Sequence, residues 1–401
     1  MPINIGDNRI VEDGIARITE ADAQRLGGHR VQSGDIIYSR RGDVERRALV
    51  RPEQDGWLCG TGCLKVRIGR GRVDPLFAAY YLGHPQVRAW IVQHAIGATM
   101  PNLNTSIMRA VPFLIPPLPE QKAIAQILGT LDDKIEVNRR MNETLEGMAR
   151  ALFKSWFVDF DPVLDNALAA GNPIPEAFRD RAAQRADAAT SAASQGRPFG
   201  LPKPLAAQFP NAFHDSDLGP IPEGWEVGTL GDIASNPRRS VRHEKIPEET
   251  AYIALEHMPR GSIALNEWGS ADGVASNKYE FHQGEILFGK LRPYFHKVGV
   301  APLDGVCSTD ILVVVPQEAS CAGYVLGIVS SSQFIDYTTA TSGGTRMPRT
   351  NWKDMAAYPT PLPSSGPVSA FNTWSEETVK RIHTNIYQSK SLAALRDALL
   401  P

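Results

Sequence analysis

The sequence reads Ile135-Glu136-Val137-Asn138 near its middle and Ile382-His383-Thr384-Asn385 near its end, 247 residues later (382 − 135). The apolar residues that follow keep this spacing, with Leu145, Met148 and Leu152 after the first stretch and Leu392, Leu395 and Leu399 after the second. Apolar residues at steps of three and four are typical of one face of an α-helix. A chain of 401 residues that repeats such a face is predicted to contain a duplicated module.

The correspondence continues upstream with a slowly drifting offset. It is 247 residues between Asn104 and Asn351, 248 between Cys59 and Cys307, and 250 between Gly34 and Gly284. Small loop insertions produce such a drift, whereas chance would not preserve the order of the matches. We therefore predict two tandem copies of one module, each of which ends in a helix.

Each copy begins with short β-type runs and continues with helical sequence. The runs are rich in β-branched and aromatic residues, which favours strands, and lie at Ile36–Ser39, Leu64–Ile68, Ile286–Phe288 and Ile311–Val315. Helices are predicted at Pro75–Val92 and Ala322–Thr338, the first with Asp74 as its cap and Pro75 at its first position. Each body is therefore predicted to be mixed α and β.

The helix at the end of the first copy is predicted from Glu120 to about Phe157, a length of roughly 55 Å at 1.5 Å per residue. The weaker second helix is predicted from about Ser369 to Leu400. Both carry a narrow apolar seam, as coiled coils do. The residues assigned to these two spacer helices are Ile124, Leu128, Leu131, Ile135, Asn138, Leu145, Leu152, Trp156 and Phe157 in the first and Ile382, Asn385, Leu392 and Leu399 in the second.

A long helix with an apolar stripe must bury that stripe against something. If a two-fold axis relates the modules, the two helices run antiparallel, and we expect Asn138 and Asn385 to pair or to set the register. The alternative is that each helix packs only on its own domain. The predicted fold is α+β, with two mixed α/β domains separated by an antiparallel coiled coil with pseudo-two-fold symmetry.

A segment of different composition separates the copies. Ala, Pro, Gln, Asp and Arg dominate from Asp161 to about Asp217, and residues 182–193 hold almost no large apolar residue. Four prolines between Pro198 and Pro210 favour an extended connector. The predicted organisation is a first domain at 1–118, a spacer helix at 119–160, a linker at 161–216, a second domain at 217–363 and a second spacer helix at 364–401.

The net charge of −2 argues weakly against a nucleic-acid-binding protein, since many DNA-binding proteins are basic. Residues 1–118 carry 15 Lys and Arg against 11 Asp and Glu, whereas residues 215–363 carry 12 against 18. Any DNA contact in the second domain must therefore come from a local basic patch. We expect a cytoplasmic protein without signal peptide or membrane span, and we interpret Cys59 and Cys63 as buried apolar thiols.

No motif for catalysis was found in the sequence. It contains no Gly-x-Gly-x-x-Gly, phosphate loop, Gly-x-Ser-x-Gly or His-Glu-x-x-His. Asp159, Asp161 and Asp165 could bind a divalent ion in a metal-dependent nuclease, but they are interpreted as a solvated acidic face. A binding protein is favoured over this nuclease and over an architectural coiled-coil protein.

Several stretches resemble the specificity subunits of type I restriction–modification enzymes. Ile115–Ile124, Leu131–Asn138 and Leu152-Phe153-Lys154-Ser155-Trp156-Phe157-Val158-Asp159-Phe160 are similar to the central region of that family. Gly219–Glu226 with Leu230–Ile233 is similar to the usual opening of its second recognition domain. The similarity extends over nearly the whole chain. One departure is that the first copy has no counterpart of Trp225 and Leu230–Ile233, so we expect the first domain to be shortened at its start by about 25–35 residues.

The resemblance implies a non-catalytic subunit with two target recognition domains, each reading one half of a split, asymmetric double-stranded DNA sequence. The coiled coil would set the unread gap, and the two domains would touch DNA about one helical turn, or ~34 Å, apart. Two modification subunits would supply S-adenosylmethionine-dependent adenine methylation. Restriction subunits would supply ATP-driven translocation and Mg-dependent cleavage. No cofactor or metal is expected in this chain.

Candidate DNA-binding residues are those whose side chains can bond phosphates or two atoms of one base. In the first copy they are Arg40, Arg41, Arg46, Arg47, Asn102 and Asn104. In the second copy they are Arg238, Arg239, Arg242, Lys290, Arg292, Arg346, Arg349 and Asn351. The matching turns at residues 97–104 and 344–351 are equally compatible with DNA contact and with loop scaffolding.

Overall fold

The structure, a computed structural model, describes residues 1–12, 14–69, 71–97, 99–344 and 346–400. The chain divides into two compact units, unit 1 at residues 1–137 with 388–401 and unit 2 at residues 138–387. Each unit contains one copy of the repeat and a part of both long helices, α5 (Leu118–Phe157) and α13 (Ser365–Ala398). The domain boundaries given above follow the sequence repeat rather than this division, and they stay a prediction.

A three-stranded antiparallel sheet with the order β2-β1-β3 lies at the core of unit 1. Its middle strand β1 (Ile36–Ser39) is buried along its whole length because it has a neighbour on each side. Ile36 pairs with Leu49 of β2 (Arg47–Leu49) and with Val66 of β3 (Cys63–Val66). The strands predicted at the start of the first copy are therefore confirmed.

The helix predicted at Pro75–Val92 is in fact two helices, α2 (Pro75–Tyr81) and α3 (Pro85–His94). Asp74 caps α2 as predicted, because its carboxylate accepts hydrogen bonds from the N–H groups of residues 76 and 77 at 3.0 Å. Pro85 has no N–H with which to continue α2, so a second helix starts there. Unit 1 also contains α1 (Glu20–Arg25), α4 (Thr105–Ala110) and the 3-10 turns Pro2–Asn4, Gly27–His29 and Pro52–Gln54.

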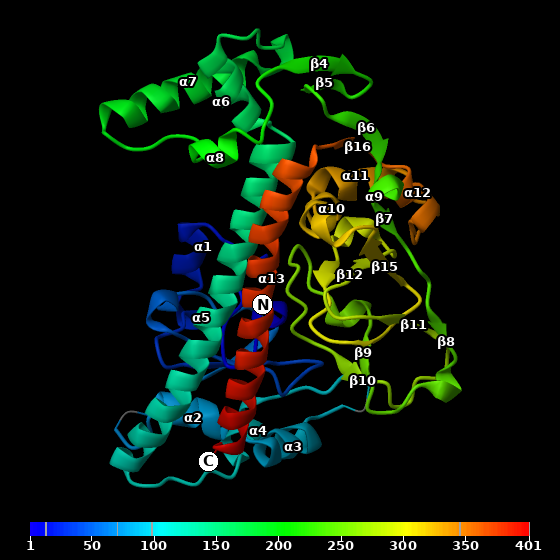
Figure 1. Ribbon diagram of the computed structural model, residues 1–401. Helices are drawn as coiled ribbons and strands as arrows, with labels where there is room; N and C mark the ends of the chain where they lie inside the picture. The colour runs from blue at the N-terminus through cyan, green and yellow to red at the C-terminus, as the bar shows by residue number, and fades with distance from the viewer. Residues whose placement is uncertain (13, 70, 98, 345, 401) are drawn as a thin grey trace. The chain divides into compact units, whose positions relative to one another are not determined.

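Two larger sheets form the body of unit 2 (Figure 1). One has the order β13-β12-β15-β7, and its strand β12 (Ile286–Gly289) is wholly buried. The other has the order β10-β9-β14-β11-β8, and two short pairs, β16-β6 and β4-β5, stand apart. The remaining strands are β4 (Phe213–Ser216), β5 (Gly219–Pro222), β6 (Glu226–Thr229), β7 (Ala234–Ser235), β8 (Ser240–Val241), β9 (Ala251–Ile253), β10 (Gly269–Ser270), β11 (Lys278–Phe281), β13 (Val298–Val300), β14 (Gly305–Cys307), β15 (Ile311–Pro316) and β16 (Pro359–Leu362).

The helix predicted at Ala322–Thr338 is also divided, into α10 (Ala322–Val329) and α11 (Ser332–Ala340). The Ser331 hydroxyl accepts a hydrogen bond from the N–H of Phe334 at 3.2 Å and thereby caps the second of these helices. The shorter helical elements of this body are α9 (Leu230–Ile233), α12 (Trp352–Ala356) and the 3-10 turns His243–Lys245, Leu255–His257, Pro293–Phe295 and Ala319–Cys321.

The segment predicted to be an extended linker is largely helical, so that prediction is wrong. It contains α6 (Asp161–Ala170), the 3-10 turn Glu176–Phe178, α7 (Arg179–Ser194) and α8 (Lys203–Ala206). Arg181 donates two hydrogen bonds to Asp161 at 2.8 and 2.7 Å, and Arg185 forms a similar pair with Asp165. These ion pairs fasten α7 to α6, although α7 has few large apolar residues of its own.

The two long helices pair in antiparallel fashion within each unit, as predicted (Figure 1). In unit 2, Phe153 packs against Phe371 at 5.9 Å between ring centroids, and Asn385 donates a hydrogen bond to Asn142 at 2.8 Å. In unit 1, Arg396 donates to Asp132 at 2.8 Å. The residue number rises along one helix as it falls along the other.

The predicted partner of Asn385 needs correction, because its buried amide bonds Asn142 rather than Asn138. In an antiparallel pair, equivalent residues face each other only at the midpoint, and these asparagines lie off it. The thirteen residues assigned to the seam differ in burial. The buried residues are Leu128, Asn138, Trp156, Phe157, Ile382 and Asn385, the half-buried residues are Ile124, Leu131, Ile135, Leu145, Leu152 and Leu392, and Leu399 is 47% exposed.

The long helices also contact the domains beside them. Tyr80 of α2, for example, donates a hydrogen bond to Asp132 of α5 at 2.7 Å.

The sheets of the two units share their order and direction, β2-β1-β3 in unit 1 and β13-β12-β15 in unit 2. Ile36 pairs with Leu49 and Val66, and Ile286 pairs correspondingly with Val300 and Val314. The tandem repeat and the α+β class are therefore confirmed. Strands β6 and β7 have no counterpart among the described residues of unit 1.

Cys59 and Cys63 are half-buried rather than buried, which corrects their interpretation, while Cys307 is buried. Cys59 and Cys63 lie at the edge of a small apolar cluster around Ile5 and Val31. None of the helices in the described part of the chain has both the length and the apolar character needed to cross a membrane.

Candidate nucleic-acid interface

The exposed arginines of unit 1 stand on a loop, residues 40–46, that joins β1 to β2. The N–H of Arg40 donates to the Gly62 carbonyl at 2.9 Å, and the Arg40 carbonyl accepts from the N–H of Leu103 at 2.9 Å. The N–H of Gly42 donates to the Pro101 carbonyl at 3.0 Å. The backbone of the loop is thus fixed, and the side chains of Arg40 and Arg41 are exposed without an ion-pair partner among the described residues.

Two further arginines predicted to bind DNA differ from each other. Arg46 is exposed and lies 3.6 Å from a carboxylate oxygen of Asp43. Arg47 is only 6% exposed, and its Nε donates to the Ala79 carbonyl at 2.8 Å. Burial lowers the pKa of the Arg47 guanidinium, which is further evidence of its enclosed position. Arg47 therefore holds β2 to α2 in this structure and presents no surface for a ligand.

The equivalent loop of unit 2, residues 290–297, is held by equivalent backbone hydrogen bonds. The N–H of Lys290 donates to the Asp310 carbonyl at 2.9 Å, and the Lys290 carbonyl accepts from the N–H of Thr350 at 3.0 Å. The N–H of Arg292 donates to the Pro348 carbonyl at 2.8 Å. These bonds match those of unit 1 one for one, so two different sets of side chains are carried on one scaffold.

The loop of unit 2 is strained where the loop of unit 1 has a glycine. Arg292 and His296 adopt left-handed φ angles of 51° and 50°, whereas the residue in the place of Arg292 in unit 1 is Gly42, with φ 76°. A non-glycine residue in this region costs about 1–3 kcal/mol and persists only where its surroundings impose it. Such strain is common at functional sites, which supports a role for this loop.

The ring of Phe295, on the same loop, lies close to two arginine side chains. The guanidinium carbon of Arg260 lies 3.9 Å from the ring centroid of Phe295, and that of Arg292 lies 5.7 Å from it. Both distances are within the range of cation–π attraction. The neighbouring Tyr294 is 50% exposed. Sequence reasoning missed Arg260, because it is 32 residues away from Arg292 and no local pattern links the two.

The carboxylate of Asp310 lies near two of these cationic side chains and partly offsets their positive charge. Asp310 Oδ1 lies 4.0 Å from Lys290 Nζ and 3.6 Å from Arg349 Nε. Arg349 also forms a backbone bridge with Leu291, so that the turn at residues 344–351 lies against the loop. Arg346 is exposed on this turn, whereas Thr345 lies outside the described residues.

The asparagines of the two matching turns have structural roles. Asn104 accepts a hydrogen bond from the N–H of Ile107 at 2.9 Å, and Asn351 accepts one from the N–H of Asp354 at 3.1 Å. Each therefore caps a short helix. Asn102 is half-buried beside Arg41, with which it forms a backbone bridge. Ala98, in the first of these turns, lies outside the described residues.

A third basic group surrounds β8, at the edge of the five-stranded sheet. Arg238 and Arg242 are exposed, while Arg239 donates two hydrogen bonds to Glu285 at 2.8 and 2.6 Å. Burial raises the pKa of the Glu285 carboxyl, but the hydrogen bonds from Arg239 and from the N–H of His282, together with the nearby positive charges, hold that pKa below its usual range. Arg239 is thus committed to an internal ion pair, whereas the exposed Arg238 donates only a long hydrogen bond to the Tyr279 hydroxyl at 3.4 Å.

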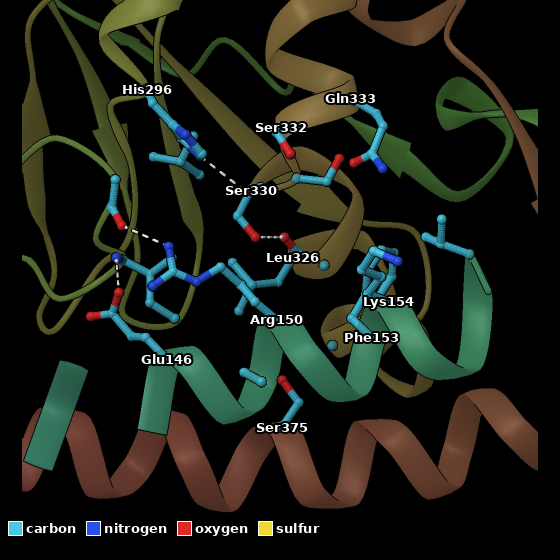
Figure 2. A pocket seen from close by; sticks show the side chains of 18 of the residues that line it. Glu146, Arg150, Phe153, Lys154, His296, Leu326, Ser330, Ser332, Gln333 and Ser375 are labelled. Atoms are coloured by element: carbon cyan, nitrogen blue, oxygen red, sulfur yellow. Dashed lines mark hydrogen bonds between the residues drawn. The ribbon is translucent and has the colours of Figure 1, made fainter. Parts of the chain in front are cut away.

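A cavity of about 340 Å³ lies beside α5 in unit 2 (Figure 2). Two of its charged side chains are bonded within the unit: Glu146 accepts hydrogen bonds from the Ser262 hydroxyl at 2.7 Å and from the N–H of Ile263 at 3.1 Å. Arg150 donates to the Gly261 carbonyl at 3.0 Å. Burial raises the pKa of Glu146 despite these bonds. These bonds tie α5 to the rest of unit 2.

The acidic residues considered for a nuclease are ion-paired, so the interpretation as a solvated face is wrong. Asp161 is 3% exposed and bonded to Arg181, and Asp159 bonds Lys154 at 2.5 Å. Burial raises the pKa of Asp161, but the hydrogen bonds from Arg181 and Ser155 and the charges of Arg181 and Arg185 together lower that pKa overall. No group of His, Cys, Asp and Glu in the described part of the chain could hold a metal ion.

Comparison with known proteins gives matches of one kind. Residues 7–147 match the family described as the type I restriction modification DNA specificity domain. The type I restriction enzyme HindI specificity subunit of Haemophilus influenzae is 24% identical over 425 residues, which cover 100% of this chain and 92% of that protein. The EcoDI specificity subunit of Escherichia coli is 24% identical over 68% of this chain and 56% of its own length.

A solved S subunit of a type I restriction–modification system from M. genitalium has 15% identity and a TM-score of 0.47, and the match covers 93% of this chain and 83% of that one. The resemblance stated from the sequence is confirmed by the family match and by the two sequence relatives.

Proposed function

We propose that this chain, a homologue of type I restriction enzyme specificity subunits along its whole length, recognises a DNA sequence for such a system. The chain itself is not an enzyme; methyl transfer and cleavage are carried by other subunits of these complexes. The observation that carries the proposal is the pair of loops at residues 40–46 and 290–297. They share a backbone frame and carry different cationic side chains, which are exposed in unit 1 (Arg40 and Arg41) and half-buried in unit 2 (Lys290 and Arg292).

A shared frame with different side chains suits the reading of two different half-sites. An arginine on a fixed backbone can hydrogen-bond both acceptors of one guanine in the major groove. We assign this role to Arg40 and Arg41 in unit 1 and to Arg292 and Arg349 in unit 2. A target read by two such loops has two parts of unlike sequence.

The remaining candidate cations, all exposed except the half-buried Lys290, are assigned to the DNA backbone, where contacts position a protein without specifying a sequence. Arg46, Lys290, Arg346, Arg238 and Arg242 belong to this group. The Asn102 amide, beside Arg41, is a further candidate for a base contact. Arg47, Arg239, Asn104 and Asn351 are assigned supporting roles, since each is buried or already bonded within the protein.

The pairing of α5 with α13 supports a scaffolding role for the two long helices. Their mutual contacts are polar and aromatic in unit 2 and ionic in unit 1. We propose that they set the unread gap in the target and that two methyltransferase subunits, and with them the restriction subunits, assemble on this chain. S-adenosylmethionine, ATP and Mg would then be bound by those partners.

The acidic net charge predicts that the chain alone binds DNA weakly, because phosphate contacts come from local patches. The test is co-expression with the methyltransferase subunit of the same system, followed by co-purification and by mapping of methylated adenines in the host DNA. We expect one complex and one two-part asymmetric motif. No stable complex, together with no DNA retention at low salt, would leave an architectural coiled-coil protein as the better description.

A further inference from the structure

Each unit has a short turn that lies against its candidate DNA-binding loop. The turn of unit 1 lies between Ile96 and Asn102, whose backbones are joined by two hydrogen bonds at 3.0 and 2.9 Å. The turn of unit 2 lies between Gly343 and Arg349, whose backbones are joined in the same way at 3.3 and 3.0 Å. The two turns are therefore closed by equivalent hydrogen bonds, as the repeat in the sequence indicates.

A methionine lies at the same place in both turns, and it is exposed in both. Met100 is 62% exposed, and Met347, 247 residues later (347 − 100), is 49% exposed. Single exposed apolar residues are common on protein surfaces, so neither value means much alone. A second matched pair of methionines behaves differently, because Met108 packs against the core of unit 1 and Met355 is fully buried in unit 2. The exposure of the first pair recurs in both copies, so it does not depend on features that only one copy has.

The backbone around each exposed methionine is restrained. Each is followed by a proline, which disfavours the helical region for the residue before it. Each turn also contains a glycine with a positive φ, 109° at Gly97 and 98° at Gly344. The turns are tight, because a Cβ atom at Gly97 would lie only 2.8 Å from the Met100 carbonyl oxygen. The methionines are thus carried on a fixed backbone, while their own unbranched side chains can adapt to a partner.

Backbone hydrogen bonds join each turn to the loop that carries the candidate arginines. The carbonyl of the proline after Met100 accepts from the N–H of Gly42 at 3.0 Å. The carbonyl of the proline after Met347 accepts from the N–H of Arg292 at 2.8 Å. Each methionine is therefore one residue away from the contact between its turn and the loop.

We propose that Met100 and Met347 contact the C5-methyl groups of thymines, one in each half of the DNA target. The inference rests on the proposed function, in which arginines of the adjoining loops reach base edges in the major groove. The thymine methyl is the apolar group that base pairs present in that groove. An apolar side chain held next to those arginines therefore selects an A·T pair close to the guanine that they read.

The surroundings of the methionines favour DNA over a protein surface as the partner. Exposed cations adjoin both turns, since Arg41 forms a backbone bridge with Asn102 in unit 1 and Arg346 directly precedes Met347 in unit 2. A protein that covered the methionines with an apolar surface would also cover these charges, at a large cost in desolvation. DNA suits both groups, with phosphates for the cations and thymine methyls for the methionines.

The test uses the complex of this chain with its methyltransferase partner and synthetic duplexes that carry the mapped motif. Each thymine of the motif is replaced in turn by deoxyuridine, which removes only the C5-methyl group. We expect one such replacement in each half to weaken binding about 3–5-fold, the loss that corresponds to one buried methyl group. Met100→Ala should weaken binding at least as much and abolish this sensitivity in one half of the motif. Met347→Ala should do the same in the other half.

Conservative and control variants separate this contact from a structural role. Met100→Leu and Met347→Leu keep an apolar side chain and should retain the sensitivity to deoxyuridine. Leu218→Ala, at a 40% exposed position between β4 and β5, is the matched control and should change neither the binding nor the sensitivity.

The proposal is overturned if no thymine of the motif is sensitive, or if both alanine variants keep the wild-type response to deoxyuridine. It is equally overturned if the alanine variants no longer co-purify with the methyltransferase subunit, because the methionines would then belong to a protein interface. Each of these outcomes leaves the proposed function in place, provided that a motif is mapped. The absence of any motif would contradict the proposed function itself and this inference with it.

Discussion

The loops at residues 40–46 and 290–297 occupy the same place in the two copies of the module, and they differ in how their cations are held. Arg40 and Arg41 are exposed and make no ion pair within the described residues. Arg292 is strained, lies near the Phe295 ring and has a buried Nε atom. A mobile arginine loses rotamer entropy on binding, whereas an arginine already held in place loses less.

The two loops therefore show which features are the same in both copies of the module and which differ. The backbone hydrogen bonds that hold the loops, the register of the shared strands and the caps at Asn104 and Asn351 match in the two units, and the side chains on the loops do not. We infer that unit 1 contributes more of the salt-dependent phosphate attraction, and that unit 2 contributes more of the geometric selectivity.

The largest expected effect concerns packing that unit 2 alone carries. Trp156 is 4% exposed and contacts Phe371 and Phe209, at 6.0 and 5.1 Å between ring centroids. Trp156→Ala should lower the free energy of unfolding by about 3–5 kcal/mol, measured by chemical denaturation. Trp90→Ala, at a half-buried tryptophan of unit 1, should cost clearly less. Equal losses would contradict the view that the aromatic cluster stabilises unit 2 in particular.

The contrast between the loops can be tested directly with DNA. In the assembled complex, Arg292→Lys should weaken binding to the mapped target nearly as much as Arg292→Ala, about 10–100-fold, because lysine lacks the planar guanidinium. Arg40→Lys with Arg41→Lys should be better tolerated than the double alanine variant, since lysine keeps the positive charge and can still donate to the acceptors of guanine. Titrations at several salt concentrations should give a shallower salt dependence for the double alanine variant. The inverse pattern would assign the two roles the other way round.

The contacts between the long helices provide a third comparison. Asn142→Leu removes the oxygen to which the buried amide of Asn385 donates and should cost about 1–3 kcal/mol at any salt concentration. Arg396→Met removes an ion pair with Asp132 and should cost less as salt is raised. Thermal unfolding at low and high salt distinguishes the two. A salt-dependent loss for Asn142→Leu would show that the pairing is not as described.

A smaller effect is expected in the helical segment that only unit 2 carries. The pKa of Asp161 is held below its ordinary value, so its ion pair with Arg181 contributes stability above about pH 4 and loses it as the pH falls through the lowered pKa. Asp161→Asn should therefore cost about 1–2 kcal/mol at neutral pH and nothing in strong acid. Unfolding curves of the two proteins should converge as the pH is lowered. A constant difference would mean that Asp161 acts through packing rather than charge.

The sequence predicted those features that local spacing determines. The cap at Asp74, the antiparallel pairing of the long helices and the duplicated strands are periodic or positional signals, and these are confirmed, whereas only some of the predicted seam residues are buried. The sequence predicts Arg47 on the loop, but the loop of the first copy is one residue shorter than the loop of the second copy. In the structure Arg47 begins β2, in the place of the buried Val298.

Other features depend on contacts between residues far apart in the sequence. Arg181 and Arg185 fold back on aspartates 20 residues earlier, which turned a predicted extended linker into paired helices. Arg260 meets Phe295 only in the folded unit, and no spacing indicates that contact. For the same reason, a single sequence assigns the candidate loops but not the base that each arginine contacts.

The most direct test of the central claim is methylation mapping of a host that carries this chain with its methyltransferase partner, in wild-type and two variant forms. Arg40→Ala with Arg41→Ala should relax or abolish recognition in one half of the two-part motif and leave the other half intact. Arg292→Ala with Arg349→Ala should do the same to the other half. If both variants alter the same half, or if the motif is contiguous, the two loops do not read separate half-sites and the account is wrong.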